Sequence, residues 1–205
     1  MKVERVSYDV MTPSAARGIL EAIHWKPAIR WQVDRIHVLK PIQFQSIRRN
    51  EVGAKASASL AASAMKRGDT HGMGIVVDEN RQQRAALVLV DVAYVIEAHF
   101  DMTVRAGPED TAAKHVSMFN RRAGQGQCFH RPCLGTREFA AEFALVPEGA
   151  PLPACELAPD KRDADLGWML HDIDFANGNE SRLFRARMAG GVIEVPPFYA
   201  EEVAR

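Results

Sequence analysis

The chain has 205 residues, of which 47% are hydrophobic and 25% charged, which is typical of a globular protein and excludes a disordered chain. No apolar run reaches the roughly 18 residues that a membrane span needs, so we expect a cytoplasmic protein with no membrane partner. The three cysteines are odd in number and form no Cys-x-x-Cys pair, which argues against a disulfide framework.

The 26 basic and 26 acidic residues cancel in net charge, but they are unevenly distributed. Residues 17–67 hold ten Lys/Arg and three Asp/Glu, whereas residues 138–180 hold two Lys/Arg and ten Asp/Glu. This asymmetry suits an anionic partner at one part of the surface and a basic partner at another. An ordinary solvated surface with uneven charges is the alternative interpretation.

The first part of the chain predicts a helix followed by strands. Residues 14–25 have helical spacing of apolar side chains, with Thr12 as the cap, Pro13 at the first helical position and Pro27 after the end. Residues 29–39 alternate as a half-buried strand does, and residues 42–47 predict a further extended segment. Residues 3–10 are a weak candidate for an opening strand.

The middle of the chain predicts a loop, a strand region, a helix and a strand. Residues 54–74 are rich in Ala, Ser and Gly, which favours a long loop or a mobile hairpin tip. Residues 85–104 form the strongest strand region and are long enough to hold a bend. Residues 110–122 predict the second helix, with polar and acidic residues at its start and Gly124 after its end. Residues 139–145 predict the next strand.

These elements predict an α+β protein with two parts. Residues 1–147 match most of a βαββαβ ferredoxin-like domain. Residues 148–205 predict a small antiparallel β-subdomain, with short strands near 168–175, 183–188 and 192–195. Asn177-Gly178 and Gly190-Gly191 lie between these strands and favour hairpin turns.

Four groups of residues carry candidate chemistry. They are Lys114-His115 in the second helix, His24-Trp25-Lys26-Pro27 at the end of the first helix, the basic loop from Arg121 to Pro132, and the basic residues Arg48, Arg49, Lys55, Lys66 and Arg67. Each has an ordinary explanation, because Lys-His pairs often lie on solvated helix faces and a histidine suits a helix C-terminus. Cys128, Cys133 and His130 lack a fourth ligand at zinc-like spacing, so neither a metal nor another cofactor is expected.

Several longer strings resemble one known family, the CRISPR-associated Cas-five family of the d (Dvulg, type I-C) subtype. The resemblance covers nearly the whole chain and is carried by Val6–Gly18, Glu21–Pro27, Pro41–Phe44, Ile47–Val52, Lys114-His115, Gly126–Pro132, Leu134–Phe139, Gly167–Leu170 and Ile173–Phe175.

The resemblance implies a ferredoxin-like (RNA-recognition-motif-like) domain followed by a small β-sheet domain. It also implies metal-independent cleavage of precursor CRISPR RNA at the repeat hairpin, with the 5′ handle retained. The implied partners are the CRISPR repeat RNA and the Cas-seven and Cas-eight subunits of the type I-C surveillance complex. Family members usually begin earlier than Met1, with an opening strand, and some carry Tyr at the position of His24.

With the resemblance, the residues suggest a mechanism of RNA cleavage. We expect His115 to act as general base or acid, Lys114 to stabilise the phosphorane, and His24 to be a partner acid/base or to orient the substrate. The products are a 2′,3′-cyclic phosphate and a 5′-OH. The expected RNA-binding residues are Arg48, Arg49, Lys55, Lys66, Arg67, Arg121, Arg122, Arg131, Trp25 and Lys26, with Phe129 or His130 as further stacking side chains.

Three alternatives remain open at this point. The chain could cap the 5′ handle without cutting RNA, as most Cas-five proteins of other subtypes do. It could bind or nick duplex DNA, since a basic surface does not distinguish DNA from RNA. It could also be an unrelated small ferredoxin-like enzyme.

Overall fold

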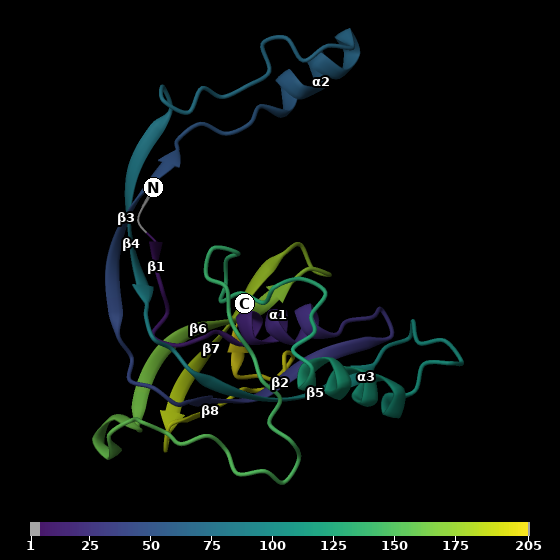
Figure 1. Cartoon of the computed structure of the whole chain (residues 1–205), viewed down its shortest axis with the longest axis vertical. Helices are drawn as coiled ribbons and strands as arrows, with labels where there is room; N and C mark the ends of the chain where they lie inside the picture. Colours follow the sequence, from purple (N-terminus) through teal and green to yellow (C-terminus); the bar gives the residue numbers. More distant parts are fainter. Residues whose placement is uncertain (1–4, 205) are drawn as a thin grey trace. The chain divides into compact units, whose positions relative to one another are not determined.

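The computed structural model describes residues 5–204 of the chain (Figure 1). The described part contains three α-helices and two β-sheets, which confirms the α+β fold class. The chain forms two compact units, each described here by itself. The described residues up to Ser7 and Gln43–Val90 make up the first unit, and Tyr8–Ile42 and the residues from Asp91 onward make up the second.

The first unit is a long β-hairpin with a short third strand. β3 (Phe44–Val52) and β4 (Arg81–Leu89) pair antiparallel over their whole length, from Phe44 opposite Leu89 to Val52 opposite Arg81. β1 (Arg5–Val6) adds in parallel to β4, in the order β1-β4-β3. Of the weak strand candidate at residues 3–10, Arg5–Val6 is a strand, and residues 3 and 4 lie outside the described residues.

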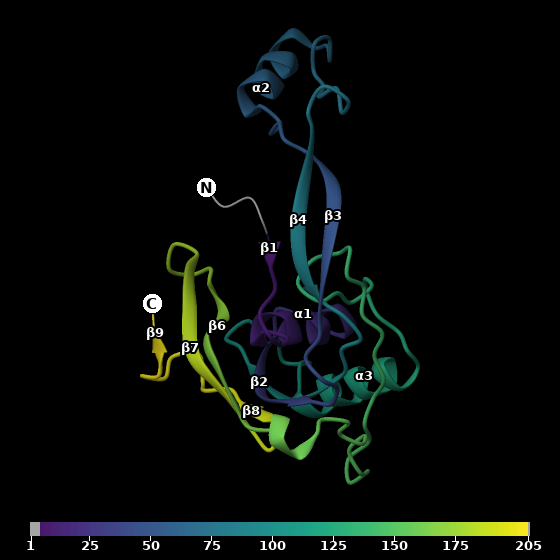
Figure 2. The same ribbon diagram turned by 90° about the vertical axis from the view of Figure 1, so that its left-hand side faces the viewer.

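The segment between β3 and β4 corrects one prediction. Residues 54–74 were expected to be a loop or hairpin tip, but they contain α2 (Ala58–Arg67), which Figure 2 shows at the end of the hairpin. Ser57 caps this helix by accepting a hydrogen bond from the Leu60 N–H at 3.2 Å, and Gly68 ends it at φ 76°. The Ala content that made the segment look featureless also favours a helix.

The second unit contains a sheet of six strands among the residues that the structure describes, in the order β5-β2-β8-β7-β6, with β9 paired to β7. The strands are β2 (Ile29–Val38), β5 (Tyr94–Met102), β6 (Ala164–Asp174), β7 (Glu180–Ala189), β8 (Val192–Glu194) and β9 (Val203–Ala204). All their pairings are antiparallel. The strand region at 85–104 is therefore β4 and β5, which belong to different sheets and different units.

Two helices accompany this sheet. α1 (Pro13–Ile23) begins where predicted, because the Thr12 hydroxyl accepts from the Ala15 N–H and Pro13 takes the first position. Its buried face packs against β2 and β6. α3 (Ala112–Gly124) is capped by Thr111, so Glu109 and Asp110 precede the helix instead of forming its first turn. A short 3-10 turn, η1 (Pro159–Lys161), lies before β6.

The strand predicted at residues 139–145 is absent. This segment makes a single isolated bridge, between Cys133 and Ala140, and is otherwise irregular. Phe143 and Leu145 nevertheless pack against the main core, which contains Ile36, Met169, Phe184 and Ile193. Alternating apolar residues here reflect a loop that lies on the core, and periodicity cannot distinguish such a loop from a strand.

The three C-terminal strands were predicted correctly, as was the turn at Asn177-Gly178, where Gly178 has φ 73°. They join the sheet of β2 and β5, because β8 pairs with β2 on one side and with β7 on the other. The division into residues 1–147 and 148–205 stays a prediction about folding units.

Candidate active site

Two histidines that are far apart in the sequence share a buried hydrogen bond. His24 caps the C-terminal end of α1, and His115 lies in the first turn of α3. Nε2 of His24 lies 3.0 Å from Nδ1 of His115. Both side chains are buried, with relative exposures of 0% and 1%. The structure therefore brings together two of the three residues that were expected to carry catalysis.

The neighbours of the pair determine which nitrogen carries each proton. Nη1 of Arg122 lies 3.4 Å from Nδ1 of His24, and a guanidinium can only donate, so this Nδ1 is an acceptor. Nε2–H of neutral His24 then donates to Nδ1 of His115, and the proton of neutral His115 lies on Nε2. That Nε2 faces Oδ1 of Asp110 at 3.5 Å. Hydrogen bonds thus join Arg122 to both imidazoles, and Asp110 lies near Nε2 of His115, which makes no hydrogen bond to any residue that the structure describes.

The electrostatics favour a neutral His24. Burial lowers the pKa of His24 to about 4, and the nearby charges of Arg122 and Lys26 act in the same direction. Trp31 also holds the end of α1, since its indole N–H donates to the His24 carbonyl at 2.8 Å. Near neutral pH this imidazole therefore serves as a fixed hydrogen-bonding group.

Asp110 links the buried pair to the surface, and the sequence analysis did not single it out as a site residue. Its Oδ1 lies 3.5 Å from Nε2 of His115 and 3.6 Å from Nζ of Lys114. A hydrogen bond from the Gly107 N–H, together with the charge of Lys114, lowers the pKa of Asp110. Asp110 and Lys114 are four residues apart, a spacing that places two side chains next to each other at a helix end. This spacing could have indicated Asp110 as a site residue from the sequence.

Lys114 and His115 are adjacent in the sequence but lie in different environments. The side chain of Lys114 is exposed, and its Nζ also donates to the Glu109 carbonyl at 3.0 Å. The His115 ring instead lies against Phe100, with ring centroids 6.1 Å apart, and Phe100 in turn packs edge-on against Trp31. A ligand that approaches from solvent meets Lys114 and Asp110 before it meets either imidazole.

The basic loop after α3 is attached to the same region. The Phe129 N–H donates to the Ala22 carbonyl at 2.7 Å, two residues before His24. The Phe129 side chain is 89% exposed, and its ring lies 6.1 Å from that of His130. The loop therefore presents an aromatic side chain to solvent close to the end of α1.

The expected RNA-binding residues fall into both units. Arg48, Arg49, Lys55, Lys66 and Arg67 belong to the first unit, and Trp25, Lys26, Arg121, Arg122 and Arg131 to the second. Most of them are exposed. Arg122 differs, because it is half-buried and its Nη1 donates to the Ile23 carbonyl at 3.0 Å. This contact ties α3 to α1 and gives Arg122 a structural partner.

Within residues 5–204, no cluster of three or more His, Cys, Asp or Glu side chains is arranged to hold a metal ion. Cys128, Cys133 and Cys155 are free thiols. No helix in the described part of the chain is long and apolar enough to cross a membrane.

Comparison with known proteins identifies the family. The family model for CRISPR-associated protein (Cas_Cas5), of the Cas5d type, matches residues 1–196. The chain belongs to the Cas5d family. The resemblance found in the sequence is thus confirmed.

Two curated relatives of this Cas5d chain carry the same printed name, CRISPR pre-crRNA endoribonuclease Cas5d. The protein of Mannheimia succiniciproducens is 62% identical over 205 residues, which cover 100% of this chain and 91% of that protein. The protein of Thermus thermophilus is 45% identical over 174 residues, which cover 85% of this chain and 66% of that protein.

Two solved structures share the fold of the chain. A crystal structure described as a CRISPR-associated protein aligns with a TM-score of 0.67 at 22% identity, covering 98% of this chain and 88% of that one. The protein SMU1763c of Streptococcus mutans, described as functionally uncharacterized, aligns with a TM-score of 0.66 at 21% identity, covering 97% and 87%. At this identity the likeness supports the fold alone.

Proposed function

We propose that this Cas5d chain is a metal-independent endoribonuclease that cuts precursor CRISPR RNA in the repeat during CRISPR defence. The names of the two curated relatives support the reaction class. One observation in the structure supports the site. A single anionic oxygen, Oδ1 of Asp110, lies within 3.6 Å of both Lys114 Nζ and His115 Nε2. A phosphoryl oxygen of RNA has the charge needed to replace this carboxylate oxygen.

In the proposed reaction, O2′ of the cleaved nucleotide attacks the adjacent phosphorus and the bond to O5′ breaks. The proton of the 2′-OH leaves to water, a water molecule returns one proton to the departing O5′, and Nε2–H of His115 donates a hydrogen bond to that oxygen and stabilises its developing charge. Lys114 stabilises the additional negative charge of the phosphorane. The products are a 2′,3′-cyclic phosphate and a 5′-OH. His24 acts as a positioning residue, because its hydrogen bond holds His115 in the Nε2–H tautomer.

Burial imposes one condition on this mechanism. His115 is 1% exposed, so RNA must move the segment before α3 to reach Nε2. Gly107 and Asp110 hold that segment through two hydrogen bonds, from the Asp110 N–H to the Gly107 carbonyl and from the Gly107 N–H to Oδ2 of Asp110. Exchange of the Asp110 carboxylate for the scissile phosphate provides a reason for the movement.

The burial of both imidazoles also supports a second candidate function, in which the chain retains the 5′ handle of the guide RNA and does not cut it.

In either function we propose that the chain works in the cytoplasm with Cas-seven and Cas-eight subunits. Exposed apolar side chains around α2, including Met65, Met73, Val76 and Val77, support a protein partner there. Binding of duplex DNA stays a prediction.

The test is cleavage of the repeat RNA in EDTA by the parent chain and by His115→Gln. We expect the parent to cut and His115→Gln to lose about a hundredfold in rate, because the amide does not reproduce the position of the imidazole N–H beside the departing oxygen. His99→Gln is the matched control, since His99 is an exposed histidine on β5 that pairs with Asp34. A 2′-deoxy nucleotide at the cut position should block the parent. Cutting of that modified strand would refute the 2′-OH mechanism, and tight binding without cutting would favour the capping function.

A further inference from the structure

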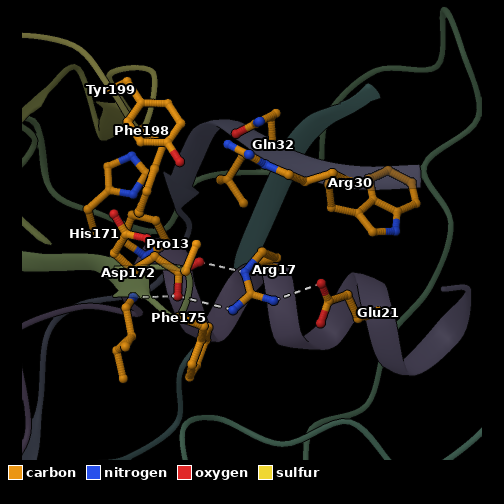
Figure 3. Close-up of a pocket in the computed structure, with 15 residues that line it drawn as sticks. Pro13, Arg17, Glu21, Arg30, Gln32, His171, Asp172, Phe175, Phe198 and Tyr199 are labelled. Carbon is orange, nitrogen blue, oxygen red and sulfur yellow. Dashed lines mark hydrogen bonds and ion pairs between the residues drawn. The ribbon is translucent and has the colours of Figure 1, made fainter. Parts of the chain in front are cut away.

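A pocket lies in the second unit, outside the group of residues around His24 and His115 (Figure 3). It is formed by α1, the start of β2, the end of β6 and the segment at Phe198 and Tyr199. Its volume is 280 Å³, just below the roughly 300–1,000 Å³ of small-molecule sites. This size suits one planar ring system and not an extended ligand.

The wall of the pocket near the C-terminus combines two aromatic rings with the guanidinium group of Arg30, and Arg182 contacts the same rings from outside the lining. Phe198 and Tyr199 meet edge to face, with ring centroids 4.9 Å apart. Cζ of Arg30 lies 5.8 and 5.7 Å from the two centroids, and Cζ of Arg182 lies 5.6 and 5.9 Å from them. Tyr199 is 63% exposed, so its ring remains accessible to a ligand. Nucleobases stack on both aromatic and guanidinium planes.

His171 lines the pocket and has one unpartnered hydrogen-bond acceptor. Its Nε2 lies 2.7 Å from the Pro196 carbonyl, which can only accept, so Nε2 carries the proton. Burial lowers the pKa of His171, which favours the neutral ring with a lone pair on Nδ1. This Nδ1 is buried and has no hydrogen-bond partner among residues 5–204. A buried acceptor of this kind calls for an N–H donor.

The charges of the pocket leave one cation available. Arg17 is held by Asp172, at 2.5 and 3.0 Å, and by Glu21 at 2.7 Å, as Figure 3 shows. Arg182 lies outside the pocket lining and faces Asp174 at 3.7 Å. No carboxylate in the described part of the chain pairs with Arg30, which lies next to Gln32 in the lining of the pocket. Arg30 can therefore pair with one anionic group of a ligand, and the rest of the pocket lining is mainly aromatic and polar.

We propose that this pocket binds one unpaired nucleotide of RNA, with its base stacked on Tyr199 and its phosphate at Arg30. The proposal rests on the proposed function only for the identity of the ligand as RNA. Gln32 adds an amide to the pocket lining. Its Nε2 donates to Asp101 at 3.2 Å, which leaves the amide oxygen available to an N–H of the base. The pocket would thus hold single-stranded RNA that flanks the cleaved hairpin.

The probe is an oligoriboadenylate octamer with one central 2-aminopurine, whose fluorescence is quenched when the base stacks. We expect the full chain to quench it on titration, and Tyr199→Leu and Arg30→Gln each to weaken binding about tenfold. Tyr199→Phe keeps an aromatic ring and should bind as the parent does. Trp168→Leu is the matched control, because Trp168 is an exposed aromatic residue on β6 that does not line the pocket.

Parent-like binding and quenching by Tyr199→Leu would overturn the proposal, and so would an equal loss in Trp168→Leu. Circular dichroism establishes that each variant is folded. If Tyr199→Leu does not fold, Arg30→Gln decides the question, because Arg30 is an exposed position on β2. Fluorescence reports binding whether or not the chain cuts RNA, so failure of the pocket and failure of the proposed nuclease are distinguishable.

Discussion

His24 and His115 lie 91 residues apart in the sequence and share a 3.0 Å hydrogen bond in a buried site. Arg122 contacts the outer nitrogen of His24, and Asp110 faces the outer nitrogen of His115. The pair is thereby placed between a cation and an anion. This polarity explains why one imidazole is a fixed support and the other carries a proton toward the surface.

Removal of the Asp110 charge tests whether its carboxylate occupies the place of a phosphate. We expect Asp110→Asn to raise the affinity for repeat RNA about two- to fivefold, because one exposed ion pair with Lys114 no longer competes with the RNA. Filter binding of RNA with a 2′-deoxy nucleotide at the cut position measures this without cleavage. Asp160→Asn in η1 is the control for the loss of one negative charge, because Asp160 also forms an exposed ion pair, with Lys161. An affinity of Asp110→Asn no higher than that of Asp160→Asn would contradict the idea.

The burial of His24 predicts a pH-dependent stability. Its pKa is about 4 in the folded chain and about 6.5 when unfolded, so the unfolded chain binds more protons between these values. The stability due to this group is therefore complete above about pH 6.5 and is lost as pH falls toward 4, by about 2 kcal/mol at pH 5. Urea unfolding at several pH values gives the slope.

His24→Gln should flatten that slope, and His99→Gln should leave it unchanged, because His99 is exposed. An identical fall in stability for His24→Gln and for the parent would mean that His24 is not the titrating group.

Arg121 and Arg122 are neighbours with opposite expected roles. Arg121 is exposed and contacts Gln127, so Arg121→Ala should weaken RNA binding and reduce the slope of log affinity against log salt by about 0.7 to 0.9. Arg122 donates to the Ile23 carbonyl, so Arg122→Ala should lower the free energy of unfolding by about 1–3 kcal/mol. Salt-dependent binding and chemical unfolding of both variants separate the roles. If Arg122→Ala reduces the salt slope and does not lower the free energy of unfolding, Arg122 belongs to the RNA-binding surface.

Arg17 connects α1 to β6 through its paired contacts with Asp172. Arg17→Leu leaves this partly buried carboxylate without its cation, and we expect the free energy of unfolding to fall by about 1–3 kcal/mol. Arg35→Leu is the control, because Arg35 pairs with Glu97 and Glu194 at an exposed position on β2. Equal losses in the two variants would show that burial of the Arg17 pair adds nothing.

Local signals predicted most of the secondary structure. Thr12 and Thr111 cap helices, and Asn177-Gly178 forms a hairpin turn, because these effects act within a few residues of the chain. The secondary-structure predictions were wrong where tertiary packing determines the local conformation. Residues 139–145 carry strand-like alternation but lie on the core as a loop, and α2 forms where low apolar periodicity had suggested a loop.

Long strings such as Gly126–Pro132 were enough to predict the family from the sequence, and with it the candidates Lys114, His115 and His24. Which of these side chains meet depends on the folded structure. It joins His24 to His115, leaves Lys114 at the surface, adds Asp110 and gives Arg122 a structural partner. The physical reason is that hydrogen bonds and burial depend on distances across the fold, and a residue's type and local spacing do not contain those distances.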